Sequence, residues 1–156
     1  MRIGFDAKRL FCNATGLGNY SRSLVRSLTQ FVPGNEYVLY TPDIRLEDAA
    51  REFGAGNPFR IVRPGKGKRM LWRTFGIPGR LNRDGIELYH GLSNELPLGI
   101  TRSGIPSVVT VHDLIFRHYP RTYPALDRKI YDLKMRHACH AADRVIAISE
   151  NTRQDI

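Results

Sequence analysis

The sequence predicts an α/β fold: a Rossmann-like, doubly wound and mostly parallel sheet with helices on both faces. Two observations lead to this prediction. Six short apolar segments alternate with segments of helical periodicity along the 156 residues, which is typical of βαβ units. A chain of this length also suffices for one domain with a substantial core. The usual strand order of such a sheet is 3-2-1-4-5-6, with a ligand crevice between strands 1 and 4.

Each of the six predicted strands is short, apolar and bounded by turn residues. They span residues 3–6, 37–40, 59–62, 86–90, 107–112 and 144–148. The fifth is rich in valine and threonine, which strands favour. A loop punctuated by Pro97 and Gly99 separates the fourth strand from the fifth.

Helices are predicted where apolar residues recur at a spacing of three or four. The first covers residues 20–31, with Asn19 as its N-cap. Shorter helices follow at residues 46–53 and 68–75, and Pro78 interrupts the second pattern. The long helix before the last strand carries on one face Leu126, Ile130, Leu133, His137 and Ala141.

The composition is that of a globular protein from a reducing compartment. Hydrophobic residues make up 42% of the chain, and no apolar run approaches the roughly 20 residues of a membrane span. The chain opens directly on a strand pattern, so no signal peptide is expected. Cys12 and Cys139 lack the spacing of a metal or redox site and are expected to be free thiols. We therefore expect a cytoplasmic protein.

The charge is strongly basic and unevenly distributed. The formal net charge is +9, and residues 60–83 contain eight Lys and Arg residues but no acidic one. Apolar side chains are interleaved with them, so Arg69, Trp72 and Arg73 are candidates for contact with an anionic membrane surface. Nucleic acid is a less favoured partner for the same stretch. The alternative is a solvated basic face whose apolar residues pack on the sheet.

Polar or glycine-containing motifs lie at or after the ends of four predicted strands. They are residues 15–19, the pair His90-Gly91, the pair His112-Asp113 and residues 149–151. Because the carboxyl ends of parallel strands open onto one crevice, we expect these motifs to meet there and to form a ligand site. Ser149 is also expected to cap the last helix.

The glycine loop suits contact with a phosphate or a sugar. Gly16, Leu17, Gly18 and Asn19 stand at the start of a helix, where backbone N–H groups and the helix dipole favour an anion. A dinucleotide-binding fingerprint would have a third glycine where Ser21 stands, and it would follow the strand directly. This departure argues against a nicotinamide enzyme. A flexible turn is the alternative interpretation.

His112 is the strongest candidate for a chemical role. A histidine at the end of a strand can act as a base, bind a sugar hydroxyl, or be a structural residue satisfied by the backbone. His112 and Asp113 point to opposite faces of a strand, so they are not a ready-made dyad. His90 and Ser149 are weaker candidates for ligand contact.

Four segments resemble the N-terminal half of glycosyltransferase family 4 enzymes, which have the GT-B fold. They are residues 15–20, 88–91, 109–114 and 142–152, and mannosyltransferase-like members are the most similar in pattern. The resemblance implies transfer of a sugar from a nucleotide-sugar to a saccharide or lipid-linked acceptor, with retention at the anomeric carbon. It implies no metal and no separate cofactor.

The resemblance also implies roles for individual residues and for the whole chain. Gly16 and Gly18 match the family's glycine loop near the donor phosphates, and His112 matches a histidine at the reacting sugar. The N-terminal domain of such enzymes chiefly binds the acceptor, and the C-terminal domain holds the nucleotide. Residues 1–156 are thus expected to be an N-terminal domain that lacks its C-terminal, donor-binding domain and turns over nothing alone.

The resemblance further places the enzyme in cell-envelope polysaccharide biosynthesis, in the cytoplasm or at the inner face of the cytoplasmic membrane. Two alternatives remain at this point. One is another nucleotide-dependent enzyme on a similar fold. The other is a non-enzymatic module that binds anionic lipid or nucleic acid.

Overall fold

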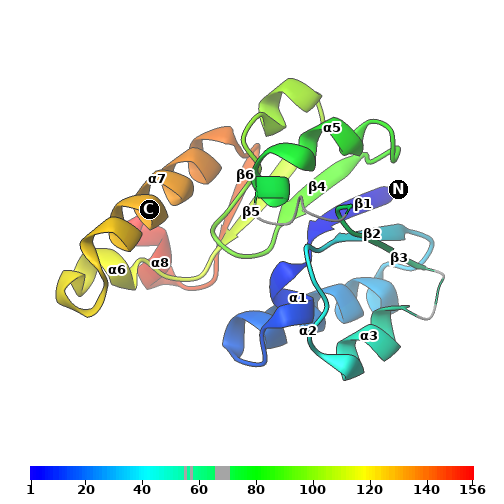
Figure 1. Cartoon of the computed structure of the whole chain (residues 1–156), viewed down its shortest axis with the longest axis horizontal. Helices are drawn as coiled ribbons and strands as arrows, with labels where there is room; N and C mark the ends of the chain where they lie inside the picture. The colour runs from blue at the N-terminus through cyan, green and yellow to red at the C-terminus, as the bar shows by residue number, and fades with distance from the viewer. Residues whose placement is uncertain (55, 57, 66–70) are drawn as a thin grey trace.

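A computed structural model describes residues 1–54, 56, 58–65 and 71–156 and shows a six-stranded sheet with helices on both faces (Figure 1). The strands are β1 (Arg2–Asp6), β2 (Glu36–Tyr40), β3 (Phe59–Val62), β4 (Leu88–Gly91), β5 (Ser107–Val111) and β6 (Arg144–Ala147). Their order is β3-β2-β1-β4-β5-β6, and all the pairings between them are parallel. The predicted fold class and strand order are confirmed.

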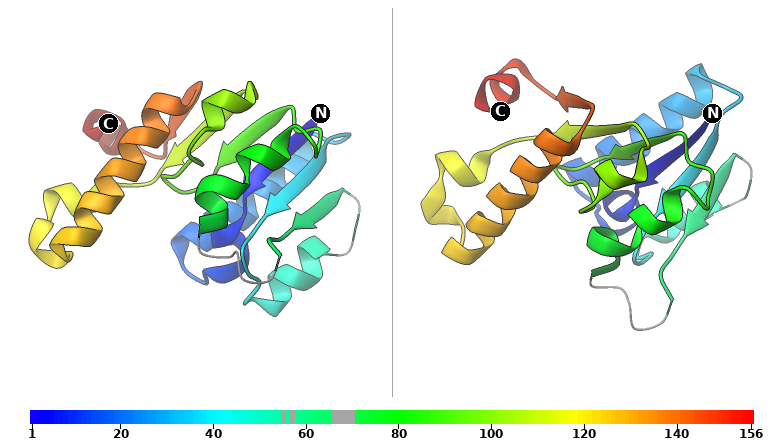
Figure 2. Two further views of the ribbon diagram at one scale, coloured as in Figure 1. Left: turned by 45° about the horizontal axis from the view of Figure 1, so that its top comes forward. Right: turned by 90° about the horizontal axis from the view of Figure 1, so that it is seen from above.

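The helices divide between the two faces of the sheet (Figure 2). One face is covered by α1 (Lys8–Cys12), α2 (Gly16–Phe31) and α3 (Glu47–Gly54), and the other by η1 (Trp72–Gly76), α5 (Pro78–Leu81), η2 (Ile100–Ser103) and α7 (Ala125–Ala141). Two short helices, α6 (Ile115–His118) and η3 (Pro120–Thr122), lie between β5 and α7, and α8 (Glu150–Asp155) follows β6.

Each face of the sheet has its own hydrophobic cluster. In β2, Tyr37 and Leu39 join the cluster under α1, α2 and α3, whereas Val38 and Tyr40 join the cluster under α5 and α7. All four side chains are buried. A strand covered on both faces therefore reads as a continuous apolar run, which is why the sequence reveals it so clearly.

The start of α2 differs from the prediction. The helix begins at Gly16 with Thr15 as its N-cap, so the assignment of Asn19 as N-cap is wrong. The Asn13 side chain takes part of the capping role instead, because its Oδ1 accepts a hydrogen bond from the Gly18 N–H at 3.1 Å. Pro78 also begins a helix, α5, rather than interrupting one, because proline is well suited to the first helical turn.

The predicted membrane-facing residues are not exposed as expected. Trp72 is only 8% exposed and packs in the core cluster under α7. The Arg73 side chain is 13% exposed and pairs with the buried Asp6. The prediction is therefore wrong for these two side chains, and Arg69 lies outside the described residues. Among the described residues of this stretch, Leu71 and Phe75 are the large apolar side chains that are exposed.

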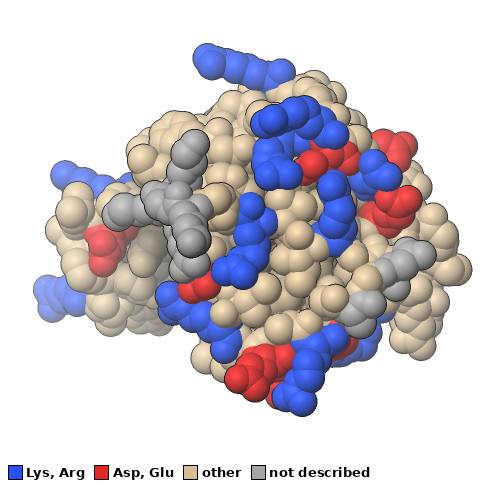
Figure 3. All heavy atoms as spheres, turned by 45° about the vertical axis from the view of Figure 1, so that its right-hand side comes forward, with Lys and Arg blue, Asp and Glu red and all other residues tan. Residues whose placement is uncertain are grey.

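Several arginines of the basic stretch find acidic partners elsewhere in the chain. Arg60 and Arg80 pair with Asp84 at 3.3 and 3.5 Å, and Arg63 pairs with Asp43 at 3.6 Å. In the space-filling view, basic and acidic side chains lie side by side at several places (Figure 3). The stretch thus fits the interpretation in which its residues pack on the sheet and pair with neighbours.

Most of the apolar face predicted for the long helix is not buried. In α7, Met135 and Ala138 are buried against the core, whereas Leu126 and Leu133 are exposed. Of the predicted residues, Ala141 packs against the core cluster at the end of the helix, but Leu126, Ile130 and Leu133 are exposed. None of the described helices is long and apolar enough to cross a membrane.

Candidate active site

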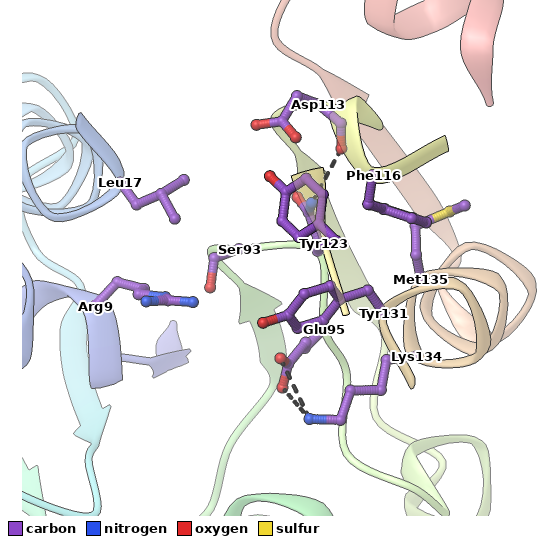
Figure 4. Close-up of a pocket in the computed structure, with 11 residues that line it drawn as sticks. Arg9, Leu17, Ser93, Glu95, Asp113, Phe116, Tyr123, Tyr131, Lys134 and Met135 are labelled. Carbon is purple, nitrogen blue, oxygen red and sulfur yellow. Dashed lines mark hydrogen bonds and ion pairs between the residues drawn. The ribbon is translucent and has the colours of Figure 1, made fainter. Parts of the chain in front are cut away.

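A cavity of about 220 Å³, the carboxyl-edge cavity, lies where the ends of β4 and β5 meet the helices (Figure 4). Arg9 of α1 and Leu17 of α2 form one side of it. The segments after β4 and β5 and the side formed by α7 contribute Ser93, Asn94, Glu95, Asp113, Phe116, Tyr123, Tyr131, Lys134 and Met135. Residues more than 100 positions apart in the sequence thus share one cavity.

Two of the predicted site residues line this cavity, and the others do not. Leu17 stands in the glycine loop and Asp113 directly follows His112, so the loop and the histidine lie at the same end of the sheet. Gly16 has open space where a side chain would be. Ser149 caps α8 as predicted, because its Oγ accepts a hydrogen bond from the Thr152 N–H at 3.1 Å.

Gly18 and Asn19 lie in the first turn of α2 and contact neighbouring residues. A Cβ atom on Gly18 would lie only 1.8 Å from the backbone oxygen of Asn13, so this position accepts no side chain without a shift of the backbone. The Asn19 side chain accepts a hydrogen bond from Arg22 at 2.6 Å. Both residues therefore shape the start of α2.

His112 is fixed from several directions and is 7% exposed. Its Nε2 lies 2.8 Å from the carbonyl oxygen of Leu92. A carbonyl can only accept a hydrogen bond, so Nε2 carries the proton and donates it. The backbone N–H of His112 donates to the Asn94 side chain, and its carbonyl accepts from the Thr152 hydroxyl. The second ring nitrogen, Nδ1, makes no hydrogen bond within the described residues.

Asn94 joins the segment after β4 to the end of β5. Its Oδ1 accepts from the His112 N–H at 2.9 Å, and its Nδ2 donates to the Asp113 carbonyl at 3.2 Å. Its φ of 56° lies in the left-handed region, which asparagine tolerates better than most residues. A non-glycine residue in this conformation at a cavity is typical of a functional site.

His90 lies in the core beneath the site. Its Nε2 is 2.8 Å from the Thr110 hydroxyl, and its ring packs against Phe5. Burial lowers the pKa of His90 to about 4, so the side chain is neutral near pH 7. It does not line the carboxyl-edge cavity. The structure therefore favours a structural role for His90 over the predicted ligand contact.

A chain of ion pairs runs from the end of β1 to Glu95 and Lys134, which line the cavity. Asp6, the last residue of β1, receives hydrogen bonds from the Arg73 guanidinium. Arg73 also lies 3.3 Å from Glu95, which in turn lies 3.4 Å from Lys134. Burial alone would lower the pKa of Arg73, but the charges of Asp6 and Glu95 outweigh burial and raise it. The Arg9 guanidinium makes no ion pair within the described part of the chain.

Within the part of the chain that the structure describes, no group of three or more histidine, cysteine, aspartate or glutamate side chains is arranged to hold a metal ion.

The sequence model of Glycosyltransferase Family 4 matches residues 14–156. The match covers most of the chain and includes the glycine loop, both histidine motifs and the start of α8. The chain belongs to glycosyltransferase family 4. No curated protein shows a significant match to this chain. In this glycosyltransferase domain, Asp6 and Arg9 lie ahead of the matched region.

Several residues of the carboxyl-edge cavity were not predicted from the sequence. Asn94 and Glu95 belong to a polar triplet that begins with Ser93, soon after a predicted strand, so the rule used for His112 and Asp113 would have found them. Lys134 carried no such signal. It lies on a long helix, and its approach to Glu95 becomes visible only in the structure.

Proposed function

We propose that this glycosyltransferase domain is the acceptor-side half of a retaining enzyme that uses a nucleotide-sugar donor, and that the carboxyl-edge cavity receives a sugar ring. The observation that carries this proposal is that Leu17, at the start of α2, and Asp113, directly after His112, line the same cavity. The volume of about 220 Å³ is below the ~300 Å³ at which pockets for larger ligands begin. A single sugar ring fits such a space better than a whole nucleotide-sugar does.

The lining has the mixture of groups that a sugar requires. The Ser93 hydroxyl, the Asp113 carboxylate and the Lys134 ammonium group provide polar contacts for hydroxyl groups. Tyr123 and Tyr131 provide apolar ring surfaces beside them. A few polar groups in a mainly apolar recess are typical of small-molecule sites.

The donor phosphates are proposed to lie at the start of α2. The N–H groups of Gly16 and Leu17 have no acceptor within the described residues, and the first turn of the helix contains no acidic side chain. The Arg9 guanidinium lies on the same side of the cavity as Leu17 (Figure 4). Free N–H groups at a helix start beside an arginine favour a phosphate.

His112 is proposed to contact the reacting sugar through Nδ1. Its Nε2 is already used by the Leu92 carbonyl, so Nδ1 is the ring nitrogen left to contact a sugar hydroxyl. The fixed ring then positions the sugar rather than moving a proton itself.

Transition-state stabilisation needs groups on both walls of the cleft. We therefore further propose that a separate nucleotide-binding domain completes the site and that residues 1–156 alone do not transfer sugar.

Ligand titration followed by NMR of the backbone amides tests the proposal. GDP-mannose and UDP-glucose serve as donor probes, and methyl β-D-glucopyranoside serves as a simple sugar. We expect shifts at Gly16, Leu17 and Asp113, with GDP-mannose bound more tightly because the motifs resemble mannosyltransferases. Asp113→Asn should weaken sugar binding about tenfold, since it removes a charged acceptor, whose hydrogen bond is worth roughly 1.5–3 kcal/mol.

Asp48→Asn is the matched control. The Asp48 side chain is exposed on α3 and does not line the carboxyl-edge cavity. It should leave all affinities unchanged. Equal losses in the two variants, or shifts confined to residues outside the cavity, would show that the sugar site lies elsewhere.

A further inference from the structure

A second cavity, the apolar groove, adjoins the carboxyl-edge cavity. It has a volume of about 330 Å³. Its apolar walls are Leu96, Pro97 and Leu98 from the segment after β4 and Ile130 and Leu133 from α7. Glu95 and Lys134 line both cavities. The two spaces are therefore neighbours that meet at one ion pair.

The charged groups at the groove already have partners. Asp6 is bound by Arg73, Glu95 lies 3.4 Å from Lys134, and His137 Nε2 lies 3.3 Å from the Pro97 carbonyl. Two carboxylates thus balance two cations along the groove. A polar or charged ligand would find few unused partners there, so hydrocarbon is the chemistry that the groove suits.

One wall of the groove is formed by exposed apolar side chains of α7. Ile130 and Leu133 follow Leu126 at the spacing of one helix face, and the buried residues Met135 and Ala138 lie elsewhere on the helix. One exposed leucine is ordinary on a protein surface. Here, however, Ile130 and Leu133 of α7 line the same cavity as Leu96 and Leu98 of the segment after β4. Apolar walls on both sides of a cavity indicate a binding surface.

We propose that the acceptor is an amphiphile, with its sugar in the carboxyl-edge cavity and its hydrocarbon chain in the apolar groove. This inference rests on the proposed function and narrows it, because a soluble saccharide would use only the first cavity. Glu95 and Lys134, which pair at 3.4 Å, line both cavities, so one molecule extends from the first cavity into the second past this pair.

Two glycosides that differ only in chain length test the inference. Calorimetry with residues 1–156 compares methyl and n-octyl β-D-glucopyranoside, the latter below its critical micelle concentration. We expect the octyl glycoside to bind at least tenfold more tightly, because its methylene groups leave water. Asp113→Asn should weaken both by a similar factor, since both share the sugar end.

Leu133→Asn and Leu126→Asn form a matched pair on α7. The two leucines are 71% and 69% exposed, but only Leu133 lines the groove. Leu133→Asn should weaken octyl glucoside binding at least fivefold and leave methyl glucoside binding unchanged. Leu126→Asn should change neither. Neither substitution removes a buried side chain, so both variants should fold.

Each of the following results would overturn the inference. Equal affinity for the two glycosides would leave the proposed sugar site intact but remove the role of the groove. Equal losses in the two leucine variants, or octyl glucoside binding that Asp113→Asn does not alter, would place the chain outside this two-part site. A dimer that Leu133→Asn converts to a monomer, with no gain from the octyl chain, would assign the groove to a second copy. If neither glycoside binds, the proposed function fails as well.

Discussion

The rings of Tyr20 and His112 lie 4.7 Å apart between centroids and are nearly perpendicular, at 89°. The Tyr20 hydroxyl is 3.1 Å from the Thr110 hydroxyl, which is also within hydrogen-bond distance of His90. Tyr20 therefore links α2 to β5 and packs against the His112 ring. Edge-to-face contacts of this kind contribute about 0.5–1.5 kcal/mol. Together with the Leu92 carbonyl, Tyr20 fixes the orientation of the imidazole.

Two substitutions of Tyr20 separate its ring from its hydroxyl. Tyr20→Phe keeps the ring and should cost about 1 kcal/mol of unfolding free energy, because it removes one hydrogen bond. Tyr20→Leu should also move the His112 imidazole resonances and weaken sugar binding. Urea denaturation and NMR of the histidine ring protons provide the measurements. If both variants shift the His112 resonances equally, the ring does not position His112.

Gly16→Ala and Gly18→Ala test which of the two glycines the start of α2 requires for stability. Gly16 has open space around it, so alanine should change the unfolding free energy by no more than about 0.5 kcal/mol. Alanine at Gly18 would collide with the Asn13 carbonyl and should cost about 1–3 kcal/mol. Urea denaturation measures both. Equal stability of the two variants would contradict the role assigned to Gly18.

The sheet could be predicted from the sequence because its strands are buried on both faces. Runs such as Tyr37 to Tyr40 are continuously apolar, and the strand order follows from the rules for parallel α/β sheets. The meeting of the glycine loop with Asp113 could be expected for the same reason. The short helix α1 could not, since five residues carry too little periodicity.

Side-chain partners that are distant in sequence could not be predicted. Arg73 lies in a stretch without acidic residues, and only the fold brings it to Asp6. Periodicity indicated an apolar face on the long helix but not which element it meets. Met135 and Ala138 lie on the side of α7 that packs against the core, whereas Ile130 and Leu133 line the apolar groove.

Stability should fall in acid because of His90. Burial lowers its folded-state pKa to about 4 from an unfolded value near 6.5. Between these pH values the unfolded chain binds more protons than the folded protein. The stability that depends on a neutral His90 is therefore fully present above pH 6.5 and is lost as the pH falls toward 4. The contribution is on the order of 3 kcal/mol.

His90→Gln tests this assignment. Glutamine can keep a polar partner for Thr110 but does not titrate, so the variant should show a flatter acid limb when urea midpoints are measured from pH 4 to 8. Other groups contribute equally to both proteins. Identical pH slopes for the variant and the parent would show that His90 is not the group responsible.

Removing one partner of the buried Asp6–Arg73 pair should destabilise the protein far more than removing one partner of a pair at the surface. Arg73→Met would leave the buried Asp6 carboxylate without its guanidinium partner and should cost about 3–5 kcal/mol. Arg51→Met removes an exposed partner of Asp48 and should cost no more than about 1 kcal/mol. Adding Asp6→Asn to Arg73→Met should recover part of the loss, because no isolated charge then remains buried. Urea denaturation of the four proteins decides the matter. A neutral effect of Arg73→Met would show that the buried Asp6 carboxylate does not depend on the Arg73 guanidinium.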